Sequence, residues 1–384
     1  METIQHQENK SWYDRQYNLL LFIPIILLIA SLVYLGFFYS QHNDLIYKDV
    51  SLSGGTSVTV QGDIDSKALE SSLKEKFSDV SFRKLTEINT GKPIALIIES
   101  SAGQEELKLA IENLIGFNLT NENSSIEFSG PVLSQSFYQE LLKIVFLSFI
   151  LMALVIFLIF GVSTRIKAVS FGLSLAAVKL TFPASTLLGI FVFIVGISAL
   201  LFGIYKSKNK KEYLFPAIAI LILIISFIFP IYYFIFPVAI LLFLTYLTES
   251  IPSVAVIFAA FSDIIFALAI VDLLEVRLSA AGIAAFLMLI GYSVDTDILL
   301  TTRALRKKDS TLNLRIYGAF KTGIFMTLTA LAAVLPAFFI ITGLPDSFRQ
   351  IFLILALGLF ADILNTWLTN AGIIKWYCQR KGIK

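Results

Sequence analysis

The chain has 384 residues, of which 57% are hydrophobic and only 15% are charged. A soluble domain carries about 25% charged residues, so this composition excludes an ordinary water-soluble protein and indicates several membrane-spanning helices. The 30 Lys and Arg residues nearly balance the 28 Asp and Glu residues, which gives no reason to expect a nucleic-acid partner. One cysteine and two histidines disfavour a disulfide framework and a zinc centre, so we expect no metal and no cofactor.

Six strongly apolar runs are long enough to cross a bilayer, which takes roughly 20 residues. After a polar N-terminus at 1–16, the first run predicts an uncleaved anchor over 17–39. The second predicts a helix over 138–160, and the others predict a four-helix bundle over 251–374, followed by a polar tail at 375–384. The runs are Tyr17–Tyr39, Leu141–Phe160, Ser253–Val271, Ala280–Thr302, Gly323–Thr342 and Phe348–Ile374.

The positions of Lys and Arg predict the orientation of the chain, because these residues collect on the cytoplasmic side of membrane proteins. One basic cluster lies between the fourth and fifth runs, and another follows the last run. If both clusters are cytoplasmic, the N-terminus is cytoplasmic too and residues 40–137 lie outside. The clusters are Arg303, Arg306, Lys307, Lys308, Arg315 and Lys321, and then Lys375, Arg380, Lys381 and Lys384.

Residues 161–250 form a further apolar region that is interrupted by a basic segment, 206–212. Both ends of the region are expected to be cytoplasmic, so it crosses the membrane either two or four times. Four crossings place the basic segment in the cytoplasm and are therefore favoured, although Lys179 weakens the first of them. The four would cover 168–184, 186–205, 213–230 and 231–247, with Pro230 at the last turn.

Residues 40–137 have the turn signals of one small extracytoplasmic domain. Four strand patterns alternate with two helical patterns, one after the first strand and one after the third. The resulting order, β-α-β-β-α-β, predicts a ferredoxin-like α+β domain. Strands are expected at Ser57–Val60, Val80–Glu87, Pro93–Ser100 and Ser125–Phe128, with helices at 65–77 and Gln104–Ile115 and a turn at 89–91.

Four aspartates fall inside the predicted spans, where an ionisable group costs roughly 2.5–3.5 kcal/mol and marks a candidate functional site. Asp263 and Asp295 lie at similar depths on helices joined by a short loop, so we expect them to be neighbours. Asp297 is two positions from Asp295 and points in a different direction. Asp362 lies near the centre of the last span.

The last span adds a polar stripe, because Asp362, Asn365 and Thr369 share one helix face. Desolvation disfavours the charged form of a carboxyl group, so such a group can bind and release a proton during a conformational cycle. The four aspartates are therefore proton-path candidates, with Arg303 and Lys321 as candidate counter-ions. The alternative is that the carboxyls only stabilise polar helix contacts or pair with Arg303, itself an ordinary positive-inside anchor.

Three segments show a family resemblance. Gly291-Tyr-Ser-Val-Asp-Thr-Asp-Ile-Leu-Leu-Thr-Thr-Arg303 resembles the signature of the SecD/SecF protein-export membrane proteins, in the archaeal SecF form. Ala259-Ala-Phe-Ser-Asp-Ile-Ile265 is similar to the preceding span of that family, and Ser53-Gly-Gly-Thr56 to the motif that opens its outside domain. The motif residues are Gly54, Gly55, Thr56, Gly291 and Tyr292.

The resemblance covers about 1–160 and 250–384 and implies a polytopic α-helical plasma-membrane protein with a resistance–nodulation–division-like six-helix core. It implies a subunit that pairs with SecD beside the SecY translocon and uses the proton-motive force to assist exported polypeptides. Asp263 and Asp295 would then lie on the proton path. There are two departures: bacterial members have Asn-Asp where this chain has Asp295-Thr296, and region 161–250 has no counterpart in the usual six-span SecF.

The sequence contains no phosphate-binding loop, nucleophile elbow or metal motif, so we expect an export auxiliary rather than an enzyme. Its partners would be a SecD-like subunit, the SecY translocon, exported polypeptides and the lipid bilayer. Two other functions stay open, a small-molecule secondary transporter of the resistance–nodulation–division superfamily and a passive translocon scaffold. A full transporter of that kind usually has two repeated halves with two large outside domains, whereas one is expected here.

Overall fold

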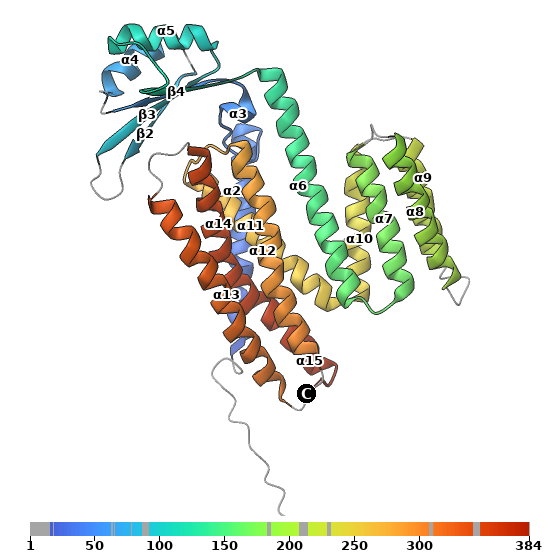
Figure 1. Ribbon diagram of the computed structural model, residues 1–384. Coiled ribbons are helices and arrows are strands. Elements are labelled where there is room, and N and C mark those ends of the chain that lie inside the picture. The colour runs from blue at the N-terminus through green and yellow to red at the C-terminus, as the bar shows by residue number, and fades with distance from the viewer. Residues whose placement is uncertain are drawn as a thin grey trace, which may run out of the picture.

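The computed structural model of the protein has a small sheet domain at one end of a bundle of long helices, with a second group of helices beside the bundle (Figure 1). It describes residues 16–17, 19–62, 64, 66–77, 79–86, 92–182, 186–206, 214–228, 232–306, 310–340 and 346–383. Several sequence predictions therefore lie outside the described residues: the N-terminus up to residue 15, the turn at 89–91, the basic segment from residue 207 and the turn at Pro230.

The sheet domain has the predicted order of elements. Its four strands lie in the order β2-β3-β1-β4, and all neighbouring pairs are antiparallel. Helices connect β1 to β2 and β3 to β4, so each connection skips over one strand. The elements are β1 (Gly55–Gln61), α4 (Ser66–Lys76), β2 (Ser81–Thr86), β3 (Pro93–Ser100), α5 (Gln104–Ile115) and β4 (Ser124–Ser129).

The helices of the domain cover one face of the sheet, and the apolar residues of the central strand β1 alternate toward that face. Val58 and Val60 of β1 are fully buried, as are Leu73 of α4 and Leu107 and Ile111 of α5. These side chains belong to one hydrophobic cluster. A two-residue period on a strand and a helical period on each helix thus give the domain a core of its own.

The main bundle contains the six predicted spans, with longer helices at two places. α6 begins at Pro131, so the expected domain boundary at residue 137 falls inside this helix; α13 begins at Leu312 rather than Gly323. The sequence predicts a later start for both helices, because the prediction follows apolar runs and the first turns of these helices contain polar residues. The helices are α2 (Phe22–His42), α6 (Pro131–Phe160), α11 (Ile251–Leu273), α12 (Ala280–Leu305), α13 (Leu312–Ile340) and α14 (Asp346–Leu364), which continues through the π-helix η3 (Asn365–Asn370) into α15 (Ala371–Arg380).

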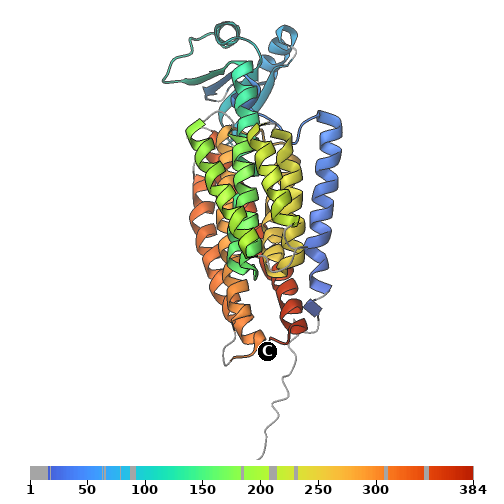
Figure 2. The ribbon, with the colours of Figure 1, turned by 90° about the vertical axis from the view of Figure 1, so that its right-hand side faces the viewer.

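The region 161–250 folds as a lateral group of helices that runs parallel to the main bundle (Figure 2). It consists of α7 (Thr164–Thr181), α8 (Thr186–Tyr205), α9 (Leu214–Ile228), and the short η2 (Tyr232–Phe234) followed by α10 (Ile235–Glu249). Ser250 donates a hydrogen bond to the carbonyl of Phe160 (3.2 Å), so the chain enters and leaves the group at one place.

Seven helices in the described part of the chain are long and apolar enough to cross a membrane: the six of the main bundle and the η2–α10 segment. Gly189–Tyr205 and Phe215–Ser226 of the lateral group are apolar but shorter. The four helices match the positions expected for four crossings, and the number of crossings stays a prediction.

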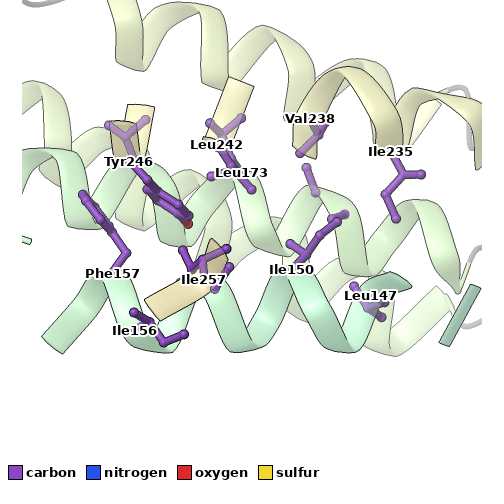
Figure 3. Packing of buried hydrophobic residues seen from close by; sticks show 14 of the residues in the cluster. Leu147, Ile150, Ile156, Phe157, Leu173, Ile235, Val238, Leu242, Tyr246 and Ile257 are labelled. Atoms are coloured by element: carbon purple, nitrogen blue, oxygen red, sulfur yellow. The ribbon is translucent and has the colours of Figure 1, made fainter. Parts of the chain in front are cut away.

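A hydrophobic cluster joins the lateral group to the main bundle through α6 (Figure 3). Phe157 of α6 stacks on Tyr246 of α10 with 4.3 Å between the ring centroids, and Ile257 of α11 reaches the same cluster. The lateral group is therefore packed as an extra layer, and it leaves the contacts between α11, α12 and α14 in place.

The Gly-Gly-Thr motif forms the entry to β1. Gly54 and Gly55 have φ angles of +85° and +119°, which favour glycine. A Cβ on Gly54 would collide with Pro131 at the start of α6, and one on Gly55 with the backbone of Ser100. The hydroxyl of the buried Thr56 donates to the backbone beyond β3 (2.7 Å). The motif thus fixes the turn that joins the sheet to the membrane helices.

Residues 43–49, here called the connector, lead from α2 to α3 (Val50–Ser53) just before the sheet and pair with the loop between α11 and α12. The N–H of Leu278 donates to the carbonyl of Tyr47 (2.7 Å), and the N–H of Asp49 donates to the carbonyl of Leu278 (3.0 Å). Ala280 donates to the hydroxyl of Ser51 (3.2 Å). The first turn of α12 is therefore tied to the base of the sheet domain.

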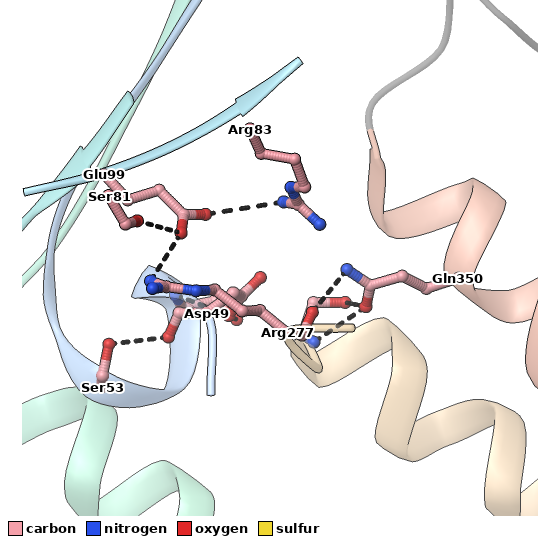
Figure 4. Close-up of polar contacts among 9 residues, drawn as sticks. Asp49, Ser53, Ser81, Arg83, Glu99, Arg277 and Gln350 are labelled. Carbon is pink, nitrogen blue, oxygen red and sulfur yellow. Dashed lines mark hydrogen bonds and ion pairs between the residues drawn. The ribbon is translucent and has the colours of Figure 1, made fainter. Parts of the chain in front are cut away.

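An ionic contact reinforces this junction (Figure 4). Glu99 of β3 is 7% exposed and accepts from Arg277 (3.0 Å), with Arg83 at 3.7 Å. Gln350 of α14 donates to the carbonyl of Arg277 (2.7 Å) and accepts from the N–H of Ser279 (2.9 Å). The sheet, the α11–α12 loop and α14 thus share one polar network.

We predict that Arg277→Gln and Glu99→Gln each lower the stability of the junction by about 1–2 kcal/mol, because each removes one member of the ion pair that Arg277 makes with the buried Glu99. Thermal unfolding of the purified chain in detergent measures both single variants and the double variant. The effects should be non-additive by about 1 kcal/mol. Additive effects would show that the two side chains act independently.

Candidate functional site

Three aspartates meet inside the main bundle and form what we call the carboxyl cluster: Asp263 of α11, Asp297 of α12 and Asp362 of α14. Asp263 and Asp297 are fully buried and Asp362 is 1% exposed. The three groups are close enough for their charges to interact. Each comes from a different helix, so the cluster exists only when the bundle is assembled.

Small side chains let these helices approach closely. Ala259, Ala260 and Ala267 are buried on α11, which packs against both α12 and α14. Gly358 of α14 lies against Leu289 of α12 with no room for a Cβ. Small residues at helix contacts are typical of membrane bundles, where close packing and hydrogen bonds replace the hydrophobic effect.

Asp263 is held by two neutral donors. The hydroxyl of Ser293 on α12 donates to Oδ2 (2.5 Å), and the side-chain amide of Asn365 in η3 donates to Oδ1 (2.7 Å). Ser293 and Asn365 are themselves 1% and 5% exposed. The carboxyl therefore bridges α11 to both neighbouring helices.

Asp297 and Asp362 share donors. Asn370 donates to Asp297 Oδ1 (2.8 Å), and the hydroxyl of Thr366 lies 2.9 Å from the same atom and 2.9 Å from Asp362 Oδ1. Thr296 contacts Asp362 Oδ1 at 2.8 Å. Thr327 of α13 contacts Asp362 Oδ2 at 3.2 Å. Within the described residues, Asp297 Oδ2 has no hydrogen-bond partner.

The cluster has fewer hydroxyl hydrogens than its contacts require. A threonine hydroxyl carries one hydrogen, so Thr366 can donate to only one of its two carboxyl neighbours. The other contact is a hydrogen bond only if that carboxyl carries a proton and donates to Thr366. Thr296 is shared in the same way, since its hydroxyl also lies 2.9 Å from the carbonyl of Ser293. The geometry thus fits a carboxyl pair that holds a proton.

The π-helix η3 positions the polar side chains of the last span. Its wider turn keeps Asn365, Thr366, Thr369 and Asn370 all buried. Asn365 reaches α11 while Thr366 and Asn370 reach α12. The predicted stripe of Asp362, Asn365 and Thr369 is therefore buried as a face, although the Thr369 hydroxyl has no partner among the described residues. π-turns inside helices occur frequently at functional sites.

Asp295 lies outside the cluster: the helices of Asp263 and Asp295 are neighbours as expected, but Asp263 is buried and contacts Ser293 and Asn365, whereas Asp295 is exposed. Asp295 is exposed on α12, on the side that also carries Gly291 and the 53% exposed Tyr292. Two positions on a helix differ by about 200° in direction, which turns Asp297 inward when Asp295 points outward. The predicted divergence of these two side chains is confirmed.

Among the described residues, neither of the two candidate counter-ions, Arg303 and Lys321, forms a hydrogen bond or ion pair with an aspartate of the cluster. Arg303 is half-buried and donates to the carbonyl of Gly318 (2.7 Å) and to the hydroxyl of Thr322 (3.0 Å), both in α13. Arg303 thus fastens α12 to α13 rather than serving as the expected counter-ion of an aspartate. Lys321 is exposed on α13.

The sequence did not lead us to predict most of the neutral side chains of the site. A helical period could have found some of them, because Thr366 follows Asp362 by four positions and Ser293 precedes Asp297 by four. Contacts between helices could not be found in this way. The overlooked residues are Ser293, Thr296, Thr327, Thr366 and Asn370.

Comparisons with known proteins agree on one family. Residues 216–380 match the family described as protein export membrane protein SecD/SecF, C-terminal. The protein-export membrane protein SecF of Methanolacinia petrolearia is 49% identical over 34% of this chain, and the match spans about half of that relative (47%). The protein of the same name from Methanocaldococcus jannaschii is 29% identical over 94% of this chain and 96% of the relative.

A solved structure has the same fold. The crystal structure of SecDF, a translocon-associated membrane protein from Thermus thermophilus, aligns with 97% of this chain and 39% of its own length, at a TM-score of 0.55 and 12% identity. The helices, the matched segment 216–380 and the nearly full-length relative together identify a multi-span membrane protein. The chain is similar to the SecD/SecF family of protein-export membrane proteins over residues 216–380, and to a SecF protein over 94% of its length.

Proposed function

We propose that this chain is a SecF-like subunit of the Sec machinery that assists the translocation or release of exported proteins and has no enzymatic activity. Similarity to the SecD/SecF family supports the export role. The observation that carries proton coupling is the buried Thr366 hydroxyl, which lies 2.9 Å from both Asp297 and Asp362. A carboxyl pair that shares one proton can exchange it when the helices move.

The proposed coupling is electrostatic. A charge that crosses 100 mV contributes about 2.3 kcal/mol, roughly fiftyfold in an equilibrium constant, which is enough to bias two arrangements of a helix bundle. Asp263, Asp297 and Asp362 lie on three helices, so the protonation of one carboxyl changes the forces between all three. Asp295, which the family resemblance placed on the proton path, has no part in this proposal.

The proposed orientation places the sheet domain, ferredoxin-like in its connections, outside the membrane and both termini in the cytoplasm. The six-helix core would be of the resistance–nodulation–division kind. In the described residues, Arg303, Arg306, Arg315 and Arg380 all lie at the bundle end opposite the sheet domain, where positive residues favour the cytoplasm.

The proposed partners are a SecD-like subunit, the SecY translocon and exported polypeptides. The named SecDF protein is translocon-associated, and this chain matches the fold of only 39% of it. The described residues form one sheet domain, whereas a complete transporter of the related superfamily has two repeated halves, which supports pairing with a SecD-like subunit.

Asp297→Asn should abolish most of the stimulation of export by an imposed proton gradient, by an order of magnitude or more, because the amide cannot exchange a proton. Asp295→Asn, two positions away and exposed, is the matched control and should keep the stimulation. Export of a secreted reporter into membrane vesicles measures both. Full stimulation in the Asp297 variant would remove proton coupling and leave a passive scaffold.

Thr366→Val should also reduce the stimulation by the gradient, since it removes the hydroxyl between the two carboxyls while keeping the side-chain volume. Thr369→Val is the control, because Thr369 is equally buried in η3 but its hydroxyl contacts no carboxyl. The dependence of export on pH, recorded for both variants, should shift only for Thr366→Val. Equal profiles would exclude the shared hydroxyl from proton exchange.

A SecD-like protein should copurify with this chain in mild detergent at a fixed ratio. Quantitative mass spectrometry of the affinity-purified complex measures that ratio. Recovery of the chain without such a partner, together with gradient-driven uptake of a small molecule, would favour the secondary transporter instead.

A further inference from the structure

Another buried acid lies at the C-terminal end of α11, close to the sheet domain. Asp272 occupies the last turn of the helix and is fully buried. Within the described residues, neither of its carboxylate oxygens has a hydrogen-bond partner. The C-terminal turn of a helix carries partial negative charge, so this position disfavours a carboxylate further. The carboxyl cluster does not explain Asp272, because nine positions place it about half a turn away in direction from Asp263.

The groups around Asp272 supply no cation. Tyr34 of α2 and Tyr138 of α6 interact with it, and Asp44 and the backbone N–H of Tyr47 face it from the connector. The nearby ammonium of Lys48 is bound to Asp44 (2.6 Å), which also accepts from Tyr138 (2.7 Å). An ionised Asp272 would therefore be buried without compensation and would repel Asp44.

The segment that covers Asp272 is also the segment that holds the sheet domain in place. Tyr47 and Asp49 pair with Leu278 through two backbone hydrogen bonds. Asp49 is itself an acid beside Glu99, and burial together with that neighbouring charge raises the pKa of Asp49 to about 6, although hydrogen bonds from Ser51 oppose the rise. The connector thus carries one carboxyl, Asp49, and covers another, Asp272, and its packed state disfavours the charged forms of both.

We infer that the connector is a proton-controlled latch: with Asp272 and Asp49 neutral it stays packed on α11 and on the α11–α12 loop, and their ionisation releases it. The sign follows from the raised pKa of Asp49, since a carboxyl that binds its proton more tightly in the packed state favours that state at low pH. This contribution is complete below about pH 4, the ordinary value of a free aspartate, and is lost as the pH rises through about 6.

The latch gives the sheet domain a response to the pH on its own side of the membrane. The responding segment is continuous with α2 and touches the loop that begins α12, which carries Asp297. The role in export rests on the proposed function, whereas the latch itself is a property of this chain alone. An acidic outer side would hold the sheet domain against the bundle, and a neutral one would free it.

Amide hydrogen exchange of the purified full chain in detergent tests the latch between pH 5 and 8. After correction for intrinsic exchange rates, the protection of peptides that cover 44–53 and 275–280 should fall about tenfold or more as the pH rises. The double variant Asp49→Asn and Asp272→Asn should stay protected throughout, and each single variant should lose part of the response. Asparagine keeps the capping function at position 49, where the side chain accepts from Ser51 (2.9 Å).

The control is Asp79→Asn, an acid of the sheet domain away from the connector. Burial alone would raise the pKa of Asp79, but hydrogen bonds from Ser101 and Ser100 lower it overall. This variant should keep the wild-type pH response. Constant protection in the wild type, or an unchanged response in the double variant, would overturn the latch. The hydrogen-exchange measurement needs neither a partner subunit nor an export assay. Its result can therefore be interpreted even if the proposed export function is wrong.

Discussion

The enclosure of three carboxyl groups between α11, α12 and the long last helix is the constraint on which the rest of the structure depends. Buried polar groups must find partners, and every partner of Asp263, Asp297 and Asp362 comes from another helix or from η3. The helices must therefore approach closely and in register, which explains the buried alanines of α11 and the glycine of α14 against α12. A neutral set of hydroxyls and amides satisfies the carboxyls without fixing their charge, as a group that exchanges protons requires.

The same helices carry the mechanical link to the sheet domain. α11 and α12 are joined by the loop at 274–279, and Arg277 and Leu278 of that loop bind the sheet and the connector. Gln350 brings α14 into the same network. Any rearrangement of the three carboxyl-bearing helices thus acts on the junction without a separate transmitting element. The lateral group, whose two ends meet at the contact of Ser250 with Phe160, packs on α6 and on α11.

The buried acids of this protein differ in the partners that surround them. Glu99 has two arginine partners and attaches the sheet domain to the α11–α12 loop. Among the described residues Asp272 has no side-chain donor, and Asp49 has only neutral ones, so the proposed latch involves these two groups. The partners of the carboxyl cluster in the described residues are neutral, and its shared hydroxyls cannot donate to every carboxyl oxygen that they contact. The structure therefore separates groups that hold the fold together from groups whose protonation can change it.

The sequence by itself determined the membrane class, the order of elements in the sheet domain and nearly every helix, because apolar run length and residue periodicity are local properties. It also showed that Asp295 and Asp297 diverge. Only the tertiary structure decided which of them is buried, since the direction of a helix face depends on its neighbours. The π-helix η3, the shared hydroxyl of Thr366 and the orphan Asp272 were beyond the sequence for the same reason: each is defined by contacts between segments that lie far apart in the chain.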